Sequence, residues 1–306
     1  MKIGVVSNND LCLPLLYFLH GNKVDVQLYF GQSLVNDQSR DTVDAFCKNS
    51  GINFQNGGQS KDSIYPWMNS FSPDAVFVLG HIHKIKRNSI NVPSSIYNIH
   101  FGKLPEYRGS SPVFWQLKNM ETEIGCSIHA LTDEMDAGPV YWQKEIKNEK
   151  HFTHNYVQYI FSNLVVDGVK EILLNSNSSQ PKEQDATKVH WYKRPSLKDV
   201  LVKWDTMKAG EICALANACN SWNVGAITLF NGIEVKIIDA DYSKSNKPSN
   251  LIPGTVNENS EALCVSCVDD EELNIHYMTL NGIPVAGRHA KKFGITEGQK
   301  FTYPSD

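Results

Sequence analysis

The chain has 306 residues, of which 41% are hydrophobic and 20% are charged, as expected for a globular protein of one large or two smaller domains. Its formal net charge of -4 gives no reason to expect a polyanionic partner, and no apolar run reaches the roughly 20 residues that span a bilayer. The start of the chain lacks the layout of a signal peptide, and the seven cysteines are an odd, scattered set that argues against a disulfide framework. We therefore expect a cytoplasmic protein that does not enter membranes.

The first 174 residues alternate between predicted strands and predicted helices. Predicted strands cover residues 2–7, 23–30, 74–80, 96–100, 125–131 and 138–146, and predicted helices cover residues 11–19, 42–50, 63–70, 113–118 and 155–174. Strands that alternate with helices indicate an α/β fold with a doubly wound, mostly parallel sheet.

A different pattern begins after residue 222. Polar, turn-rich residues 175–185 precede a predicted helix at about 208–220, and short alternating segments then follow at 226–230, 233–240, 254–257, 263–268 and 272–278. Asn231-Gly232 predicts a hairpin turn between the first two of these segments. Such a run of short strands is typical of a small β-barrel. We therefore predict an N-terminal α/β domain at 1–188, a linker and helix at 189–222, and a C-terminal β domain at 223–306.

The segment from Tyr97 to Asp136 carries the polar residues best suited to chemistry. Asn98 and His100 lie on one face of a predicted strand, because successive strand side chains point to opposite faces. That strand leads into the loop Leu104-Pro-Glu-Tyr-Arg-Gly-Ser-Ser-Pro, and Asp136 follows in the turn Asp136-Ala-Gly-Pro. An amide donor, an imidazole base and an orienting carboxylate are sufficient to move an acyl group onto an amine. Each residue alone is more typical of packing, capping or a turn, but the ordered set favours catalysis.

This segment resembles the folate-dependent formyltransferases. The resemblance rests on Asn-x-His at 98–100, on Leu-Pro-x-Tyr-Arg-Gly-x-x-Pro at 104–112 and on Asp-Ala-Gly at 136–138. It implies a Rossmann-like catalytic domain, an OB-like C-terminal barrel as in the tRNA-directed members, and formyl transfer from 10-formyltetrahydrofolate to a primary amine without a metal. Asn98 would then donate to the formyl oxygen. His100 would be the base or a charged partner of that oxygen, and Asp136 would orient His100 or relay the proton through water.

The resemblance also suggests where the folate and the acceptor bind. In the family, backbone groups of two loops bind the pterin ring, and the corresponding residues here are Gly80, His81, Ile82, Asp133 and Glu134. His81 and His83 have no third ligand in register, so we expect no metal site. For the acceptor we single out Tyr107, Arg108 and Ser110. Arg108 either binds an anionic group of the substrate or fixes its own loop, and we interpret His129 as structural.

The charge distribution bears on which amine is formylated. The tRNA-directed members of the family carry a basic insertion early in the chain, whereas residues 31–44 here hold one Arg and three Asp. Near the C-terminus, Arg288, Lys291 and Lys292 form only a small basic cluster. A protein that neutralises many phosphates should contain more Lys and Arg, so nucleic acid is disfavoured. We predict a small-molecule acceptor, with a nucleotide-linked amino sugar fitting best.

Several alternatives stay open. The acceptor could instead be methionyl-tRNA or an amino-acid-type amine such as hydroxyornithine, and water as acceptor would make the protein a hydrolase. A non-catalytic folate-binding module is an alternative of another class, and the intact Asn98, His100 and Asp136 set argues against it. Ser110 stands where the aminoarabinose formyltransferases have an Arg, which disfavours that particular acceptor. The oligomeric state is also open, with a homodimer as one alternative.

Overall fold

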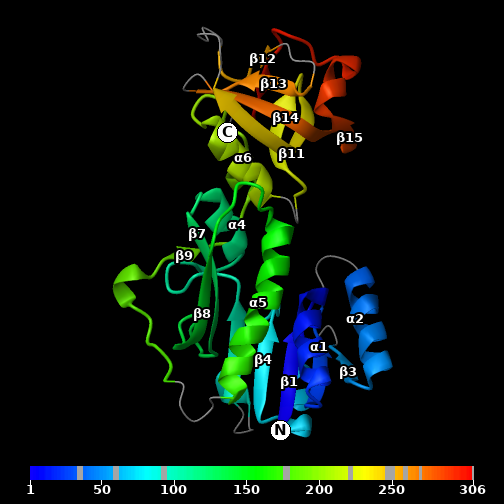
Figure 1. Ribbon diagram of the computed structural model, residues 1–306, viewed down its shortest axis with the longest axis vertical. Coiled ribbons are helices and arrows are strands. Elements are labelled where there is room, and N and C mark those ends of the chain that lie inside the picture. The colour runs from blue at the N-terminus through cyan, green and yellow to red at the C-terminus, as the bar shows by residue number, and fades with distance from the viewer. Residues whose placement is uncertain are drawn as a thin grey trace. The chain divides into compact units, whose positions relative to one another are not determined.

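The computed structural model describes residues 1–32, 37–57, 62–90, 95–174, 180–219, 223–244, 252–257, 261–268 and 271–304. The chain forms two compact units (Figure 1), of which unit 1 comprises residues 1–112, 124–146 and 158–192, and unit 2 comprises residues 113–123, 147–157 and 193–306. The domain boundaries expected at residues 188 and 222 stay predictions. None of the described helices is long and apolar enough to cross a membrane.

Unit 1 is built on a sheet that is parallel over most of its width. In the described part of the chain its strands follow the order β3-β2-β1-β4-β5-β7-β8. Neighbours from β3 to β5 pair in parallel, whereas β7 runs antiparallel to β5. The predicted α/β class is therefore confirmed. The strands are β1 (Lys2–Ser7), β2 (Asp25–Phe30), β3 (Asn53–Asn56), β4 (Ala75–Leu79), β5 (Ser95–His100), β7 (Glu123–Ala130) and β8 (Val140–Lys147).

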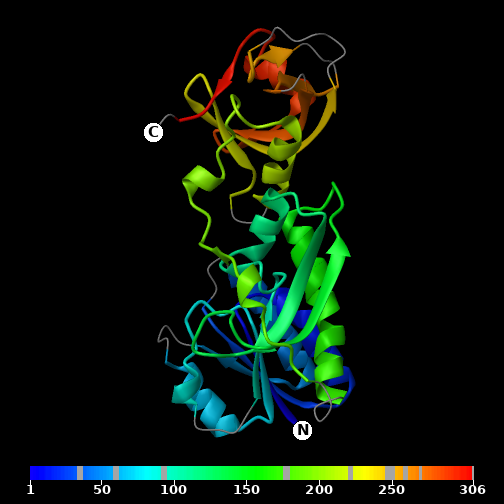
Figure 2. The same cartoon turned by 90° about the vertical axis from the view of Figure 1, so that its left-hand side faces the viewer.

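Helices cover both faces of this sheet. This unit has α1 (Leu13–Gly21), α2 (Asp37–Ser50), α3 (Ile64–Phe71) and most of α5 (His154–Leu174), whereas α4 (Pro112–Lys118) belongs almost wholly to unit 2. On one face, Trp67 and Phe71 of α3 belong to a buried cluster with Val76 and Ile96. On the other face α5 approaches β7 and β8, because a Cβ at Gly168 would lie 2.8 Å from the Ile128 side chain. Figure 2 shows α5 (green) along one side of the sheet, so α3 and α5 lie on opposite faces.

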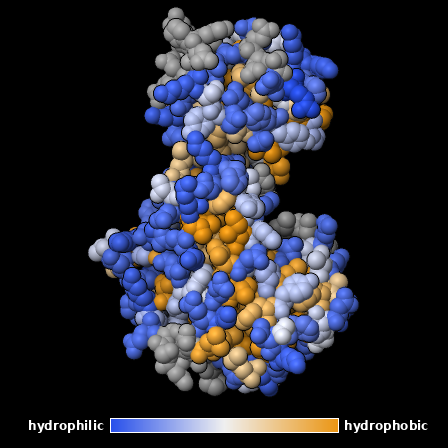
Figure 3. Space-filling model, viewed as in Figure 1, coloured by the Kyte–Doolittle hydropathy of each residue, from blue (hydrophilic) through white to orange (hydrophobic). Residues whose placement is uncertain are grey.

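The outer surface of α5 is also apolar in part. Figure 3 shows hydrophobic residues gathered over the region where Figure 1 draws this helix. Ile160 and Leu164 are only half-buried, whereas Phe161 and Val165 are fully buried. The helix therefore presents apolar side chains both to the core and to its outer surface.

Unit 2 contains an antiparallel sheet that nearly closes into a barrel. Its strand order is β12-β13-β14-β11-β10-β16 in the described residues, and β15 also pairs with β14. A bridge between Thr255 and Lys300 brings the two ends of that order together, which confirms the predicted barrel-like domain. The elements are α6 (Ala209–Ala218), β10 (Ala226–Phe230), β11 (Ile233–Lys244), β12 (Val256–Asn257), β13 (Leu263–Ser266), β14 (Glu271–Leu280), β15 (Ile283–Ala286) and β16 (Phe301–Thr302).

The local predictions hold where apolar periodicity or turn chemistry is strong. Asn231 and Gly232 both have positive φ, of 49° and 77°, and they join β10 to β11 as the predicted hairpin requires. A second Asn-Gly turn, Asn281-Gly282, joins β14 to β15, and a 3-10 helix, Gly287–Phe293, follows. The edge strand β3 was not predicted, because its polar, mostly exposed sequence gives no alternation to detect.

Candidate active site

The central polar residues lie on β5 and on its antiparallel neighbour β7. Asn98 and His100 point to the same face as Ile96, which places them on the side of the sheet that α3 covers. In the register of β5 with β7, Asn98 lies directly opposite His129. Cross-strand partners of this kind share a face, so His129 joins the predicted pair.

The structure brings the three predicted catalytic side chains together. Asn98 donates from Nδ2 to Oδ1 of Asp136 at 3.4 Å, and Nδ1 of His100 lies 3.7 Å from the same oxygen. His100 is 7% exposed and Asp136 is 9% exposed, whereas Asn98 is half-buried. An amide, an imidazole and a carboxylate therefore lie close together in a largely buried site, although His100 and Asp136 are 36 positions apart in the sequence.

The loop that carries Asp136 is held in place by hydrogen bonds to its backbone and its carboxylate. Asp136 has a φ of +51°, and its Oδ2 accepts a hydrogen bond from the Gly109 amide at 2.9 Å. Gln184 donates from Nε2 to the carbonyl oxygens of Asp136 and Gly138, at 2.8 and 2.7 Å. Gly109 itself has a φ of +96°, and a Cβ there would collide with the Tyr192 carbonyl oxygen. These contacts fix where the carboxylate points.

Arg108 belongs to the same supporting network. Its Nε donates to Oε1 of Gln184 at 2.9 Å, its Nη1 lies 3.4 Å from Oε1 of Glu134, and its guanidinium lies over the Trp191 ring at 5.6 Å. The side chain is 7% exposed. The sequence left two roles open for Arg108, which were binding an anionic group of the substrate and fixing its own loop. These contacts fit the second role, although the partners of Arg108 are side chains.

The burial of the site and its hydrogen bonds set the charges of the ionisable groups. Burial alone would raise the pKa of Asp136, but the His100 and His129 imidazoles in their protonated forms, together with the Gly109 amide, outweigh it and lower the pKa to about 2. Burial also lowers the pKa of His100, and it outweighs the opposing effects of Asp136 and the Tyr107 carbonyl. At neutral pH the site therefore contains an ionised carboxylate beside a neutral imidazole.

Hydrogen bonds also assign the tautomers of the two histidines. His100 contacts the Tyr107 carbonyl oxygen through Nε2 at 2.7 Å, and a carbonyl only accepts, so the proton is on Nε2 and Nδ1 is free to take one. His129 contacts the Ala130 carbonyl oxygen through Nδ1 at 2.9 Å, so its Nε2 accepts from Nδ2 of Asn98 at 3.1 Å. This contact fixes the orientation of the Asn98 side-chain amide, with its NH₂ group toward His129.

Two residues of this site were not assigned a role from the sequence. His129 was interpreted as structural, and only the strand register reveals that it lies against Asn98. Gln184 carries no signal in the sequence, since it lies 48 residues beyond Asp136 in a polar segment. Both are found only through contacts between distant parts of the chain.

The residues predicted to bind folate lie in two loops that touch. Oδ1 of Asp133 accepts a hydrogen bond from the Arg87 amide at 3.3 Å, which links the loop after β7 to the segment that follows β4. Gly80 directly follows β4 and has a φ of +77°, a conformation that favours glycine. Next to it, burial lowers the pKa of His81 to about 4, and both ring nitrogens of His81 are buried without a hydrogen-bond partner in the described residues. Ile82 is half-buried and Glu134 is exposed.

The residues predicted to bind the acceptor differ in their accessibility. Tyr107 is 4% exposed and stacks on Tyr192, with ring centroids 4.9 Å apart and planes 7° apart. Its carbonyl is the partner of His100, so the Tyr107 backbone orients the His100 ring. Ser110 is exposed, and its amide donates to the Tyr192 carbonyl at 2.9 Å, which leaves its side chain at the surface. A small parallel pairing of β6 (Arg108–Gly109) with β9 (Trp191–Tyr192) holds this loop.

A neutral imidazole, an ionised carboxylate and an oriented amide, brought together by β5, β7 and the Asp136 loop, are the groups that acyl-transfer chemistry requires. A family model described as formyl transferase matches residues 27–161, and one described as the C-terminal domain of formyl transferase matches residues 196–287. The chain therefore belongs to the folate-dependent formyltransferase family, whose members use formyl-tetrahydrofolate, and it is an N-formyltransferase.

Relatives and solved structures of two kinds resemble this chain. The methionyl-tRNA formyltransferase of Dictyoglomus thermophilum is 28% identical over 221 residues, which are 71% of this chain and 70% of that protein. The crystal structure of WlaRD, a sugar 3N-formyl transferase with dTDP and 5-N-formyl-THF, covers 90% of this chain and 96% of its own, with a TM-score of 0.69 at 18% identity. The N-formyltransferase of Helicobacter canadensis, in complex with folinic acid and dTDP-3-aminofucose, covers 90% and 98%, with a TM-score of 0.67 at 17% identity.

Proposed function

We propose that the protein transfers the formyl group of 10-formyltetrahydrofolate to the primary amine of a nucleotide-linked amino sugar in the cytoplasm. The main support for formyl transfer is that the Asn98 amide and the His100 imidazole both lie within 3.7 Å of the Asp136 carboxylate. The sugar acceptor is supported by the similarity in fold to two sugar-directed enzymes over 90% of this chain. It is also supported by α2, where the only two basic residues are Arg40 and Lys48 and where Lys48 is paired with Asp44 at 2.7 Å.

In the proposed mechanism His100 takes a proton from the acceptor amine. The amine nitrogen bonds to the formyl carbon, and Nδ1 of His100 accepts the proton that this nitrogen loses. The resulting imidazolium would lie 3.7 Å from the Asp136 carboxylate, whose lowered pKa keeps it ionised. Collapse of the intermediate breaks the bond from the formyl carbon to N10, and His100 returns the proton to N10.

Asn98 would stabilise the negative charge that develops on the formyl oxygen. Its Nδ2 makes a 3.1 Å contact with His129 and a longer, 3.4 Å contact with Asp136. We infer that the longer contact is exchanged for one to the formyl oxygen while His129 keeps the amide oriented. A single well-placed donor of this kind contributes about 3 kcal/mol in acyl-transfer transition states.

The test is the release of tetrahydrofolate from 10-formyltetrahydrofolate in the presence of different amines. We expect turnover with one or more nucleotide-linked amino sugars, saturable in the acceptor and only weakly dependent on salt between 50 and 200 mM. No turnover with any amino sugar, together with rapid turnover of methionyl-tRNA, would overturn the acceptor proposal while preserving the chemistry. The His100→Ala variant is the control for both acceptors, since it lacks the base.

Methionyl-tRNA is the second candidate acceptor, and two observations favour it. The curated relatives carry this activity in their names, with 28% identity for the Dictyoglomus thermophilum protein. In addition, the 3-10 helix Gly287–Phe293 exposes Arg288, His289, Lys291 and Lys292, and none of the ion pairs in the described residues involves them. If tRNA is the acceptor, replacing Lys291 and Lys292 by Glu should raise the KM for tRNA several-fold and leave the KM for folate unchanged.

A further inference from the structure

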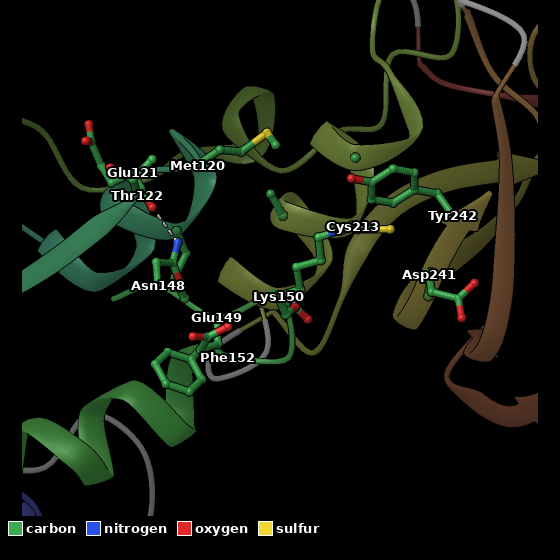
Figure 4. Close-up of a pocket in the computed structure, with 15 residues that line it drawn as sticks. Met120, Glu121, Thr122, Asn148, Glu149, Lys150, Phe152, Cys213, Asp241 and Tyr242 are labelled. Atoms are coloured by element: carbon green, nitrogen blue, oxygen red, sulfur yellow. Dashed lines mark hydrogen bonds between the residues drawn. The ribbon is translucent and has the colours of Figure 1, made fainter. Parts of the chain in front are cut away.

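A cavity lies wholly within unit 2. Its volume is about 330 Å³, and its walls come from the end of α4 with the turn after it, from residues 148–152, from α6 and from β11 (Figure 4). None of the residues assigned to formyl transfer lines it. The volume lies at the lower end of the range of small-molecule sites, which is about 300–1,000 Å³.

The walls of this cavity are joined by hydrogen bonds. Nδ2 of Asn148 donates to the Glu121 carbonyl at 2.8 Å, and the Asn148 amide donates to the Thr122 carbonyl at 2.9 Å. On the opposite side, Nδ2 of Asn217 in α6 donates to the Lys150 carbonyl at 3.0 Å. The segment at 148–150 is thus tied to both neighbouring walls, which gives the cavity a defined shape.

Much of the lining is apolar. Leu117, Met120, Phe152 and Ala214 contribute hydrocarbon or aromatic surface, and Met120 is 48% exposed although it is apolar. Burial raises the pKa of the Cys213 thiol to about 12, so this side chain is uncharged and adds to the apolar wall. When an apolar ligand covers an apolar wall that was exposed to solvent, the free energy falls, and this favours binding.

One cation faces this apolar space. The Lys150 ammonium lies 5.2 Å from the centroid of the Tyr242 ring, and Figure 4 shows the Lys150 side chain extending toward Tyr242 and Cys213. The lining also holds three carboxylates, those of Glu121, Glu149 and Asp241. Glu149 pairs with Lys147 at 2.8 Å, and Asp241 lies 3.0 Å from the His276 imidazole. Figure 4 shows the Glu121 carboxylate turned away from Lys150. In the described part of the chain, Lys150 enters no ion pair.

We propose that this cavity binds a small amphiphilic anion, meaning a molecule with an apolar, ring-sized body and one carboxylate, sulfonate or phosphate group. The body would lie against Met120, Phe152 and Ala214, and the anionic group would accept hydrogen bonds from the Lys150 ammonium and the Tyr242 hydroxyl. Partial desolvation by the apolar wall strengthens such charge-assisted bonds.

The test uses the full chain and the dye 8-anilinonaphthalene-1-sulfonate, which has the chemistry that the cavity should recognise. We expect saturable fluorescence enhancement with one site per chain, and 5-formyltetrahydrofolate should not displace the dye. Lys150→Met should weaken binding about tenfold or more, because it removes the one charged donor. Ala214→Trp should abolish binding by filling the cavity. Lys188→Met, which removes an exposed lysine of unit 1, is the matched control and should bind as the wild type does.

Two further measurements separate the proposal from its alternatives. The uncharged analogue N-phenyl-1-naphthylamine should lose little affinity in Lys150→Met but all of it in Ala214→Trp. Circular dichroism and tetrahydrofolate release confirm that each variant is folded. Binding of the sulfonate dye that is unchanged in both variants, or that 5-formyltetrahydrofolate displaces, would refute the site.

Discussion

The Asp136→Asn substitution tests the site most directly, because it removes one charge and changes the volume very little. Both carboxylate oxygens of Asp136 accept hydrogen bonds, Oδ2 from the Gly109 amide and Oδ1 from Asn98. An asparagine can accept at only one of these positions, so its own NH₂ group would face another donor. Leaving a buried donor unpaired costs about 1–3 kcal/mol. We expect a loss of this size in the free energy of unfolding at pH 7.

The pKa of Asp136 predicts how the stabilisation by this carboxylate depends on pH. The folded protein lowers this pKa from 3.8 to about 2, which favours the ionised, folded form by on the order of 2 kcal/mol. Because the folded pKa is the lower one, this stabilisation is fully present above about pH 4 and is lost as the pH falls toward 2. The difference between wild type and Asp136→Asn should therefore shrink on acidification.

Urea unfolding at pH 7 and at pH 3 measures this difference, and tetrahydrofolate release measures turnover. We expect kcat to fall by about 100-fold or more in Asp136→Asn, because the imidazolium loses its counter-charge. Asp167→Asn, on the exposed side of α5, is the matched control and should change neither quantity. If kcat of Asp136→Asn stayed within threefold of wild type, the assignment of Asp136 to the reaction would be wrong.

Three other predictions concern the groups around this carboxylate. Gln184→Leu should lower kcat about tenfold with little change in the KM for folate, because it releases the carbonyls of Asp136 and Gly138; an unchanged kcat would show that Gln184 only stabilises the fold. Since burial lowers the pKa of His100 below 6.5, the acid limb of the profile of kcat/KM against pH should lie below pH 6.5, and a limb at higher pH would contradict a neutral buried base. Gly109→Ala should destabilise unit 1 by about 3 kcal/mol or more in urea unfolding, because its φ is +96° and a Cβ would overlap Tyr192; a stable variant would mean that this loop can move.

The order of strands and helices could be predicted because each element carries its own periodicity. The apolar run at 75–79 and the largely apolar stretch at 95–100 are local patterns, and the observed strands β4 and β5 match them closely. The candidate catalytic residues could be identified because they cluster in short motifs at fixed separations. In contrast, α2 begins at Asp37, five residues earlier than expected, because its first turn is polar.

What the sequence could not supply were contacts between segments that are far apart in the chain. The sequence contains His129 and Gln184, but no local sequence pattern predicts that either residue lies beside Asn98 or Asp136. The register of β5 against β7 brings His129 to Asn98, and the folding of residues 180–188 back onto the Asp136 loop brings Gln184 to its backbone. Periodicity is a property of neighbouring residues, whereas the tautomer of His100, the charge of Asp136 and the direction of the Asn98 amide depend on burial and on distant partners. The sequence therefore determined which groups are available for chemistry, and only the tertiary structure decided how each one is protonated and aimed.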